Sequence, residues 1–426
     1  MGLLRVLAFR PFAFLWVGQF ISRFGDSLYQ ITLAWWILEK TGSATAMGTV
    51  LIFSFTPMLL FLPIGGVAVD RLPRVKVMML SDLIRGAIAT VVSLLAFTHV
   101  LQIWHVYVAS LIFGFIEAFF QPAYTATVPE ITPSELLNSA NTLTSLSVQI
   151  AGVAGPAISV FLVKLGGTPT IFALDALSFF VSFLCLILLS GSLKPDIIAR
   201  TAPADVRKQI NTECKSPWLW VKFQIKSFTS DVLEGINTVI KLPWLWITIT
   251  IATLGNVTQS GPFSVGLPFL VEDNLHADVN TLGLLYSVSS FGSVIGAIWL
   301  SRLTKVHKRG LLTYCAWMLG GLMTIVIGLS FSIVSISLAV LIRGAMFAIF
   351  NLMWMNTLQE LVPREMLGRV SSIDNLGSSI LLPVGYGIAG WATDLFGASI
   401  VFVIGGVSTV GLAALGLFHP AIRYLD

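Results

Sequence analysis

The stretch GGVAVDRLPRVK, residues 65–76, places four charged residues between two long apolar segments. These segments cover residues 45–69 and 77–98, and each is long enough to cross a bilayer as a helix, which takes about 20 apolar residues. The charged residues of the stretch are Asp70, Arg71, Arg74 and Lys76. Because charges at this density avoid the hydrocarbon core, the stretch is predicted to be a surface loop between two membrane-spanning helices.

The composition of the whole chain agrees with a membrane protein. Of its 426 residues, 56% are hydrophobic and only 11% are charged, against about 25% charged in soluble domains. The apolar stretches are apolar on all faces, whereas the strands of a membrane β-barrel alternate with period two. The sequence therefore predicts an all-α integral membrane protein.

Twelve stretches are long and apolar enough to be predicted as transmembrane helices. A polar segment, residues 194–241, separates the sixth from the seventh, which predicts an N-terminal six-helix bundle (1–193), a cytoplasmic linker (194–241) and a C-terminal six-helix bundle (242–426). The predicted spans are 12–37, 45–69, 77–98, 103–126, 137–164, 169–192, 243–270, 280–301, 310–331, 334–357, 368–392 and 398–418.

Lysine and arginine set the predicted orientation. With both termini inside, 20 of the 25 basic residues fall in inner segments, and only Lys40 and Lys164 fall in outer loops. Cytoplasmic loops are enriched in these residues, so both termini are predicted to be cytoplasmic and the protein to lie in the cell (inner) membrane. This asymmetry explains the net charge of +4 without a nucleic-acid partner.

The two halves of the chain repeat each other. An offset of 230 residues lays VPEITPSELL (128–137) on LQELVPREML (358–367). The same offset pairs Gly66 with Gly296, Gly114 with Gly344, Phe120 with Phe350, Thr127 with Thr357 and Glu130 with Glu360. One offset at three separate places predicts two pseudo-symmetric six-helix bundles, the architecture of a carrier that works by alternating access.

The opening stretch resembles the loop between helices 2 and 3 of the major facilitator superfamily. The matching pattern is Gly-x-x-x-Asp-Arg-x-x-Arg-x-Lys, at Gly66, Asp70, Arg71, Arg74 and Lys76. The resemblance implies a gating latch, in which Gly66 allows a close helix approach and Asp70 faces the positive N-terminal end of helix 11. The three basic residues would engage carboxylates and lipid phosphates, although plain cytoplasmic anchoring also accounts for Arg71 and Lys76.

Two further stretches are similar to the macrolide-efflux and enterobactin-exporter branch of that superfamily. They are GQFISRFGDSLYQITLAWWILEKTGSATAMG (18–48) and PSELLNSANTLTSLSVQIAGVAGPAI (133–158). Within the second, Gly152, Gly155 and Pro156 resemble a shortened antiporter motif, which implies a close-packed hinge in helix 5. Phe113 stands about where many drug/proton antiporters carry an arginine.

Ionisable residues inside predicted spans are functional candidates because they are costly there. Asp26 is the first candidate proton carrier, with Arg23 three residues away on the same helix face, and a permanent structural pair is the alternative. Glu117 has no cation at suitable spacing in its own helix, which predicts a carboxyl protonated at rest. Asp175 is a third candidate carrier or a hydrogen-bond acceptor.

The other deep charges have gating or binding predictions. Asp82 and Arg85 are predicted to join the cytoplasmic gate network, with a purely structural role as the alternative, and Asp374 to pair with Arg71 or Arg74 across the two halves. Arg343 is predicted to meet an anionic substrate group or a carboxylate of the first half.

The predicted cavity is aromatic, with polar side chains that orient the substrate, as suits amphipathic compounds. Phe263 and Gln259 are among its expected linings. The substrate-binding candidates are Arg23, Gln19, Phe20, Phe120, Gln121, Arg343, Phe347 and Asn351.

Several function classes fit poorly. The chain has no phosphate-binding glycine loop, no Ser-His-Asp grouping and no metal-ligand spacing, which argues against an enzyme, a cofactor or a metal. A channel fits the repeat less well than a carrier, and a scaffold would need no deep carboxylates. We expect a monomeric, proton-coupled exporter of amphipathic drugs such as macrolides. Export of an endogenous metabolite such as a siderophore is the alternative, and nutrient import is third.

Overall fold

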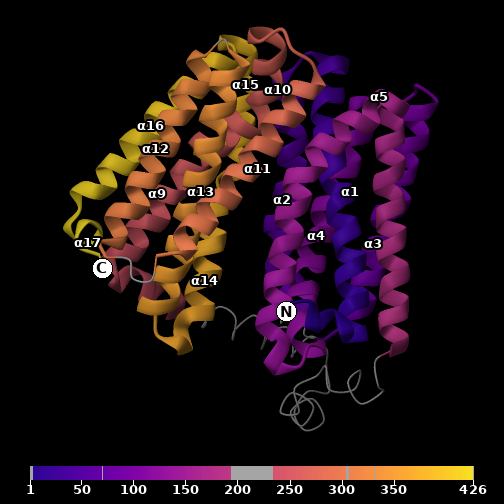
Figure 1. Cartoon of the computed structure of the whole chain (residues 1–426), viewed down its shortest axis with the longest axis horizontal. Coiled ribbons are helices and arrows are strands. Elements are labelled where there is room, and N and C mark those ends of the chain that lie inside the picture. Colours follow the sequence, from indigo (N-terminus) through magenta and orange to yellow (C-terminus); the bar gives the residue numbers. More distant parts are fainter. Residues whose placement is uncertain (1–2, 70, 193–233, 304–306, 331, 426) are drawn as a thin grey trace. The chain divides into compact units, whose positions relative to one another are not determined.

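The computed structural model describes residues 3–69, 71–192, 234–303, 307–330 and 332–425 (Figure 1). Every regular element among these residues is a helix. The first half contains the short helix η1 (Leu3–Ala8), α1 (Arg10–Thr41), α2 (Ala44–Val69), α3 (Arg74–Phe97), α4 (Ile103–Ile131), η2 (Ser134–Leu136) and α5 (Leu137–Ser192). The predicted all-α class is therefore confirmed.

The second half begins, within the described residues, at a short helix, Glu234–Lys241, that bends by 102° into the next one. Its later elements are α9 (Pro243–Gly261), η3 (Pro262–Gly266), α10 (Leu267–Phe269), η4 (Leu270–Asn274), α11 (Val279–Ser301), α12 (Arg309–Leu329), α13 (Ile333–Leu361), α14 (Arg364–Ser379), α15 (Leu382–Phe396), α16 (Ala398–Phe418) and α17 (Pro420–Arg423). Of these, η3 and η4 are π-helical.

The helices follow the twelve predicted spans with two differences. Eight helices of the described chain are long and apolar enough to cross a membrane, or nine if the bent pair counts as one span. Predicted spans five and six are joined in α5, which breaks helical geometry at Gly167 with φ of 73°. Predicted span eleven is divided into α14 and α15. Most of the predicted linker, residues 194–233, lies outside the described residues.

The chain groups into two compact units. Unit 1 contains Met1–Leu33 and Phe53–Phe228, and unit 2 contains Ala34–Ile52 and Thr229–Asp426. The division therefore passes through α1 and α2, whose adjoining ends group with the second half of the sequence. The terms inner and outer denote the predicted cytoplasmic side and the opposite side.

Unit 1 is held together by close helix crossings. An added Cβ at Gly114 of α4 would collide with the Ser54 carbonyl of α2, and one at Gly65 would collide with the Ala118 carbonyl. Only glycine permits backbones to approach this closely. Near their inner ends the helices bury an apolar cluster that includes Phe12 and Met78.

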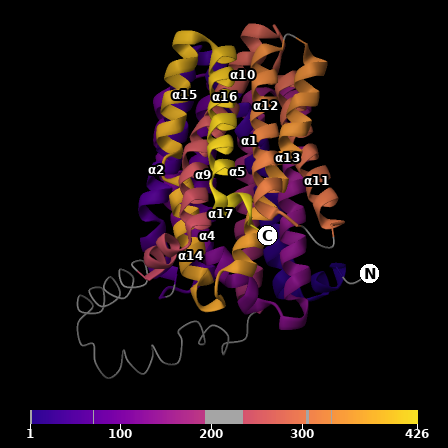
Figure 2. The same cartoon turned by 90° about the vertical axis from the view of Figure 1, so that its left-hand side faces the viewer.

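Unit 2 repeats this crossing between α11 and α13, which are drawn side by side in Figure 2, and α13 also packs against α12. A Cβ added at Gly344 of α13 would collide with the Ser289 carbonyl of α11, and one at Gly296 with the Ala345 carbonyl. Gly344 is the residue that the sequence offset pairs with Gly114. The repeat read from the sequence therefore reappears as the same glycine contact in both units.

Candidate functional site

A chain of buried polar side chains links four helices of unit 1. Gln19 Nε2 on α1 donates to Ser182 Oγ on α5 at 2.9 Å, and Ser182 Oγ donates to Asp82 Oδ2 on α3 at 2.6 Å. Arg85 Nη2 donates to Asp82 Oδ1 at 2.7 Å. Asp82 is fully buried, so its charge is compensated by these neighbours rather than by water.

Arg85 extends this chain to α4. Its Nη1 lies 3.2 Å from Glu117 Oε2, and its guanidinium stacks over the rings of Phe120 and Phe179, at 4.1 and 4.9 Å from their centroids. One guanidinium thus holds two carboxylates while aromatic faces cover it. We call Gln19, Ser182, Asp82, Arg85 and Glu117 the unit 1 polar network.

The structure pairs residues that the sequence treated separately. Asp82 and Arg85 contact Ser182 and Glu117 inside unit 1, and their place in the cytoplasmic gate network stays a prediction. Glu117 has no cation in its own helix, as the sequence indicated, but α3 supplies Arg85. The spacing rules for one helix could not reveal this pair because its members lie 32 residues apart, on different helices.

Asp26 lies beside this network with an exposed side chain, although it is near the middle of α1. It is within electrostatic range of Arg85, Glu117, Arg23 and Asp82. No ion pair joins Arg23 to Asp26 in the described part of the chain. Instead, the Arg23 guanidinium lies 5.4 Å from the ring centroid of Tyr124, and its Nε has no hydrogen-bond partner there.

Asp175 on α5 is the most isolated of the deep carboxyls. It is 1% exposed, and its Oδ1 has no hydrogen-bond partner among the described residues. A Cβ added at Gly25 of α1 would lie 3.0 Å from this oxygen, and Asp26 is within electrostatic range. A buried carboxyl oxygen without a partner is costly at such a position, so Asp175 stays a functional candidate.

The predicted substrate-binding side chains of unit 1 have different surroundings. Gln19 is buried and bonded to Ser182, and Phe120 is buried beneath Arg85. Phe20 stacks on Trp16 with centroids 5.4 Å apart, and Gln121 is exposed. In this structure Gln19 and Phe120 therefore contribute to internal packing rather than to an open surface.

In unit 2, the predicted binding residues lie along α13. Arg343 is buried, whereas Phe347 and Asn351, which follow at intervals of four residues, are exposed. Asn351 Nδ2 donates to the Phe347 carbonyl at 2.9 Å. Residues four apart share a helix face, so the three side chains form a line from the buried guanidinium to the surface of the unit.

The predicted gating motif is partly described. Asp70 lies outside the described residues, so its approach to helix 11 stays a prediction. Arg74 Nη1 pairs with Glu130 Oε2 of α4 at 3.0 Å, and Arg71 and Lys76 are exposed. The expected close approach of Gly66 to a helix of the other half stays a prediction, whereas the neighbouring Gly65 makes a tight contact inside unit 1, against the Ala118 carbonyl.

Asp374 lies in unit 2, and its predicted pairing with Arg71 or Arg74 of unit 1 stays a prediction. Its Oδ2 accepts a hydrogen bond from Trp354 Nε1 at 3.0 Å, within unit 2. Arg74 has Glu130 as its ion-pair partner. The sequence argument missed Glu130 as a partner, although the internal repeat had marked it.

The predicted helix 5 motif packs closely against α1. A Cβ at Gly155 would collide with Ser27 Oγ, and Ser27 Oγ donates to the Ala151 carbonyl at 2.9 Å. Pro156 is buried, and the segment stays helical through Gly152 and Pro156. The close packing is confirmed, and the hinge role stays a prediction.

A contact that the sequence did not reveal joins the outer end of α2 to α15. Asp394 accepts hydrogen bonds from the Ala44 and Thr45 amides at 2.6 and 3.0 Å and from Ser43 Oγ at 2.8 Å, which caps α2. A Cβ at Gly390 would lie 2.5 Å from the Ala44 carbonyl. No local pattern links positions 350 residues apart, although Asp394 stands out as a charge directly after a predicted span.

The sequence argument also missed Ser182. Asp175, Ser178 and Ser182 recur at spacings of three and four, which places them on one helix face, and all three are buried. This polar stripe in an otherwise apolar segment is the signal that could have identified Ser182.

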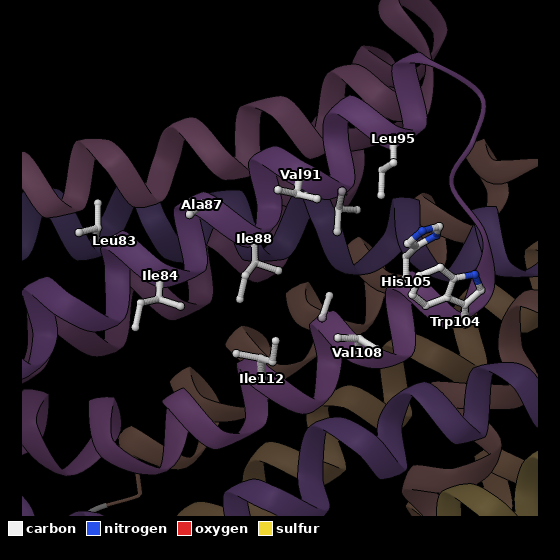
Figure 3. Close-up of a pocket in the computed structure, with 12 residues that line it drawn as sticks. Leu83, Ile84, Ala87, Ile88, Val91, Leu95, Trp104, His105, Val108 and Ile112 are labelled. Atoms are coloured by element: carbon white, nitrogen blue, oxygen red, sulfur yellow. The ribbon is translucent and has the colours of Figure 1, made fainter.

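An apolar groove of about 410 Å³ lies between α3 and α4, away from these charges (Figure 3). Leu83, Ile88 and Val91 line it from α3, and Trp104 and Val108 line it from α4. Of these side chains, Val91 and Trp104 are more than half exposed. Such a surface suits lipid chains, so the groove is separate from the candidate site.

Comparison with known proteins identifies the family. The sequence profile of the Major Facilitator Superfamily matches residues 15–386 and 249–423. The chain belongs to the major facilitator superfamily. It is therefore a multi-pass membrane protein and a secondary transporter, not an enzyme.

Curated relatives of the chain are distant and include two kinds of exporter. Macrolide efflux protein A of Streptococcus pyogenes is 23% identical over 416 residues, which cover 97% of this chain and 96% of the relative. Enterobactin exporter EntS of Citrobacter koseri is 25% identical over 424 residues, covering 95% and 90%. The predicted resemblance to these two kinds of exporter is thus confirmed at the level of distant relatives.

Solved structures show the same fold. A POT family transporter in complex with 5-aminolevulinic acid superposes with a TM-score of 0.73 at 15% identity, covering 97% of this chain and 96% of the other. The nucleoside transporter NupG gives a TM-score of 0.64 at 13% identity, covering 96% and 99%.

Proposed function

We propose that the protein exports amphipathic small molecules by alternating access, in exchange for protons, with macrolide-type drugs as the first candidate substrates. Proton coupling is supported by an excess of carboxyl groups over guanidinium groups in the interior of unit 1. Among the described residues, four deep carboxyls, on Asp26, Asp82, Glu117 and Asp175, lie near two guanidinium groups, on Arg23 and Arg85. Arg85 compensates Asp82 and Glu117.

The two remaining carboxyls differ in access, and this difference suits proton exchange. Asp26 is exposed and can exchange protons with water, whereas Asp175 is buried and lacks a partner at Oδ1. We therefore take Asp26 as the first proton carrier, Asp175 as the second and Glu117 as the third. A carboxyl beside a cation and beside other acids changes its proton occupancy when those neighbours move, which couples protonation to conformation.

Macrolide-type substrates are supported by the similarity to macrolide efflux protein A over nearly the full chain. A second candidate, export of an endogenous metabolite such as a siderophore, is supported by the similarity to enterobactin exporter EntS and by Arg343, a cation that suits an anionic compound. In both cases we propose that the termini are cytoplasmic and that Gly66, Arg71, Arg74 and Lys76 contribute to the inner gate.

The test uses inverted membrane vesicles that contain the protein. An inside-acid pH gradient is imposed, and uptake of erythromycin, tetraphenylphosphonium and enterobactin is measured for wild type and for Asp26→Asn. Glu135→Gln is the control, because it neutralises an exposed carboxylate outside the spans. We expect gradient-driven uptake of erythromycin or the cation, lost in Asp26→Asn and kept in Glu135→Gln.

Other outcomes separate the alternatives. Uptake of enterobactin alone would replace drug export by metabolite export. Uptake that survives Asp26→Asn, or that persists when an ionophore collapses the gradient, would contradict proton coupling through Asp26.

A further inference from the structure

Arg343 occupies a deep position in unit 2. It lies ten residues along α13 from Ile333, which corresponds to a depth of about 15 Å at 1.5 Å per residue. This depth is about half of the roughly 30 Å hydrocarbon core. The residue is 7% exposed, so its charge is held within the protein.

The guanidinium of Arg343 has contacts but no counter-ion. Its Nη2 donates to the Gln259 backbone carbonyl of α9 at 3.3 Å, and its Cζ lies 4.0 Å from the ring centroid of Phe263. No carboxylate forms an ion pair with it in the described part of the chain. By contrast, Arg85 of unit 1 has both Asp82 and Glu117 within 3.2 Å.

Two hydrogen-bond donors at this guanidinium lack an acceptor. Arg343 Nε has no hydrogen-bond partner among the described residues, and neither has Nε2 of Gln259, which is 5% exposed. Both groups can only donate, and the main-chain contact at Gln259 brings their residues together. Buried donors without acceptors are costly, so this place favours a ligand that supplies oxygen acceptors and negative charge.

The walls around the guanidinium are aromatic and locally irregular. Phe263 lies in the π-helical segment η3, and Tyr286 of α11 donates from its hydroxyl to the Phe263 carbonyl at 3.3 Å. Their rings are 5.4 Å apart, at an interplanar angle of 82°. π-Helical turns often mark functional sites, and these rings offer a flat apolar surface beside the charge.

The same face of α13 continues from the charge toward the predicted inner side of the unit. Phe347, one turn beyond Arg343, is 48% exposed, and Asn351 is exposed one turn further. An exposed asparagine suits a wet surface better than lipid. An amphipathic molecule can therefore lie along this face with its charged end at Arg343.

We propose that Arg343 and Gln259 form a binding site for the anionic group of an aromatic or amphipathic organic acid. A planar carboxylate matches the fork of guanidinium donors, and Phe263 and Tyr286 contact the apolar body. This inference rests on the proposed transport function and deepens it, because it adds a negatively charged group to the substrate class.

The test measures binding, without transport, for the full-length protein in phosphatidylcholine nanodiscs. Equilibrium dialysis compares 2-naphthoate with its neutral isostere 2-naphthamide, with empty nanodiscs subtracted. We expect wild type to bind naphthoate at least tenfold more tightly than naphthamide. Arg343→Gln should abolish this preference, Arg343→Lys should keep part of it, and Gln259→Leu should weaken naphthoate binding several-fold.

The matched control is Arg309→Gln, which removes a guanidinium from the same unit at a position paired with Glu360. It should keep the wild-type preference. Equal affinity of wild type for the two probes, or a preference that persists in Arg343→Gln, would overturn the proposal. Because binding needs no pH gradient, a negative result here leaves proton-driven export to its own test. Arg343→Lys keeps the proposal falsifiable if Arg343→Gln fails to fold.

Discussion

The two units share their packing but differ in their buried charge. Gly114 in unit 1 and Gly344 in unit 2 meet serine carbonyls of a neighbouring helix. The interior of unit 1 contains several carboxyls around Arg85, whereas Arg343 of unit 2 has no carboxylate partner among the described residues. The packing is constrained in both units because helices cross there, so the repeat has kept it, while the buried charges were free to diverge.

The difference indicates where the two units contribute to transport. Carboxyls can take up and release protons, whereas an arginine stays charged. Unit 1 is therefore the half suited to proton exchange, and unit 2 is the half suited to a permanent cation for a ligand. Four predictions test this comparison of the two units, in order of decreasing expected effect.

Removal of Arg85 and removal of Arg343 should lower the free energy of unfolding by very different amounts. Arg85→Met would strand Asp82 and Glu117 without a cation, and loss of one partner of a buried pair costs about 3–5 kcal/mol. Arg343→Met strands no carboxylate, and loss of its aromatic contact should cost about 1–2 kcal/mol. The measurement is the free energy of unfolding in mixed micelles. Equal losses would contradict the comparison, and adding Asp82→Asn and Glu117→Gln to Arg85→Met should restore stability.

The shared packing should be equally sensitive in both units. Gly114→Val and Gly344→Val each force a side chain against a serine carbonyl of the facing helix. Overpacking of this kind costs about 1–3 kcal/mol. The midpoint of thermal unfolding in detergent should fall by similar amounts for the two variants. Gly411→Val is the control, because a Cβ there meets nothing within 4 Å, and a loss as large as for Gly114→Val would refute the packing argument.

The cap on α2 should have a moderate effect. Asp394→Ala removes the acceptor for the Ala44 and Thr45 amides, and loss of a helix cap costs about 0.5–2 kcal/mol. We expect faster alkylation of a cysteine introduced at Thr45 by a membrane-impermeant maleimide. Asp394→Asn should be intermediate because its amide oxygen still accepts hydrogen bonds. Unchanged alkylation in Asp394→Ala would show that this cap does not hold the outer end of α2.

The smallest effect is expected at two similar ion pairs, one inside each unit. Arg74 pairs with Glu130 at 3.0 Å, and Arg309 pairs with Glu360 at 2.6 Å. Such partly exposed pairs contribute about 0–1 kcal/mol, so Glu130→Gln and Glu360→Gln should each lower stability only slightly. A loss above about 2 kcal/mol in either variant would show that the pair has a larger structural role than its exposure predicts.

The sequence alone determined the fold and the repeat. Long apolar helices, basic inner loops and the 230-residue offset follow from rules that act locally, because the bilayer requires each span to satisfy its own backbone. It also identified nearly every deep charge as a candidate. It could not assign partners, since Arg85 and Glu117 meet across two helices and Ser182 reaches Asp82 over 100 residues.

The way these charges are compensated follows only from the folded structure. Asp82 and Arg85 meet Ser182 and Glu117 in the interior of unit 1, and the tight contact of α2 with α4 falls at Gly65. The physical reason is helix rotation. A turn of 100° per residue decides which neighbour a side chain meets, and in a span that is apolar all round, periodicity does not fix that rotation. Packing of the neighbouring helices fixes it instead.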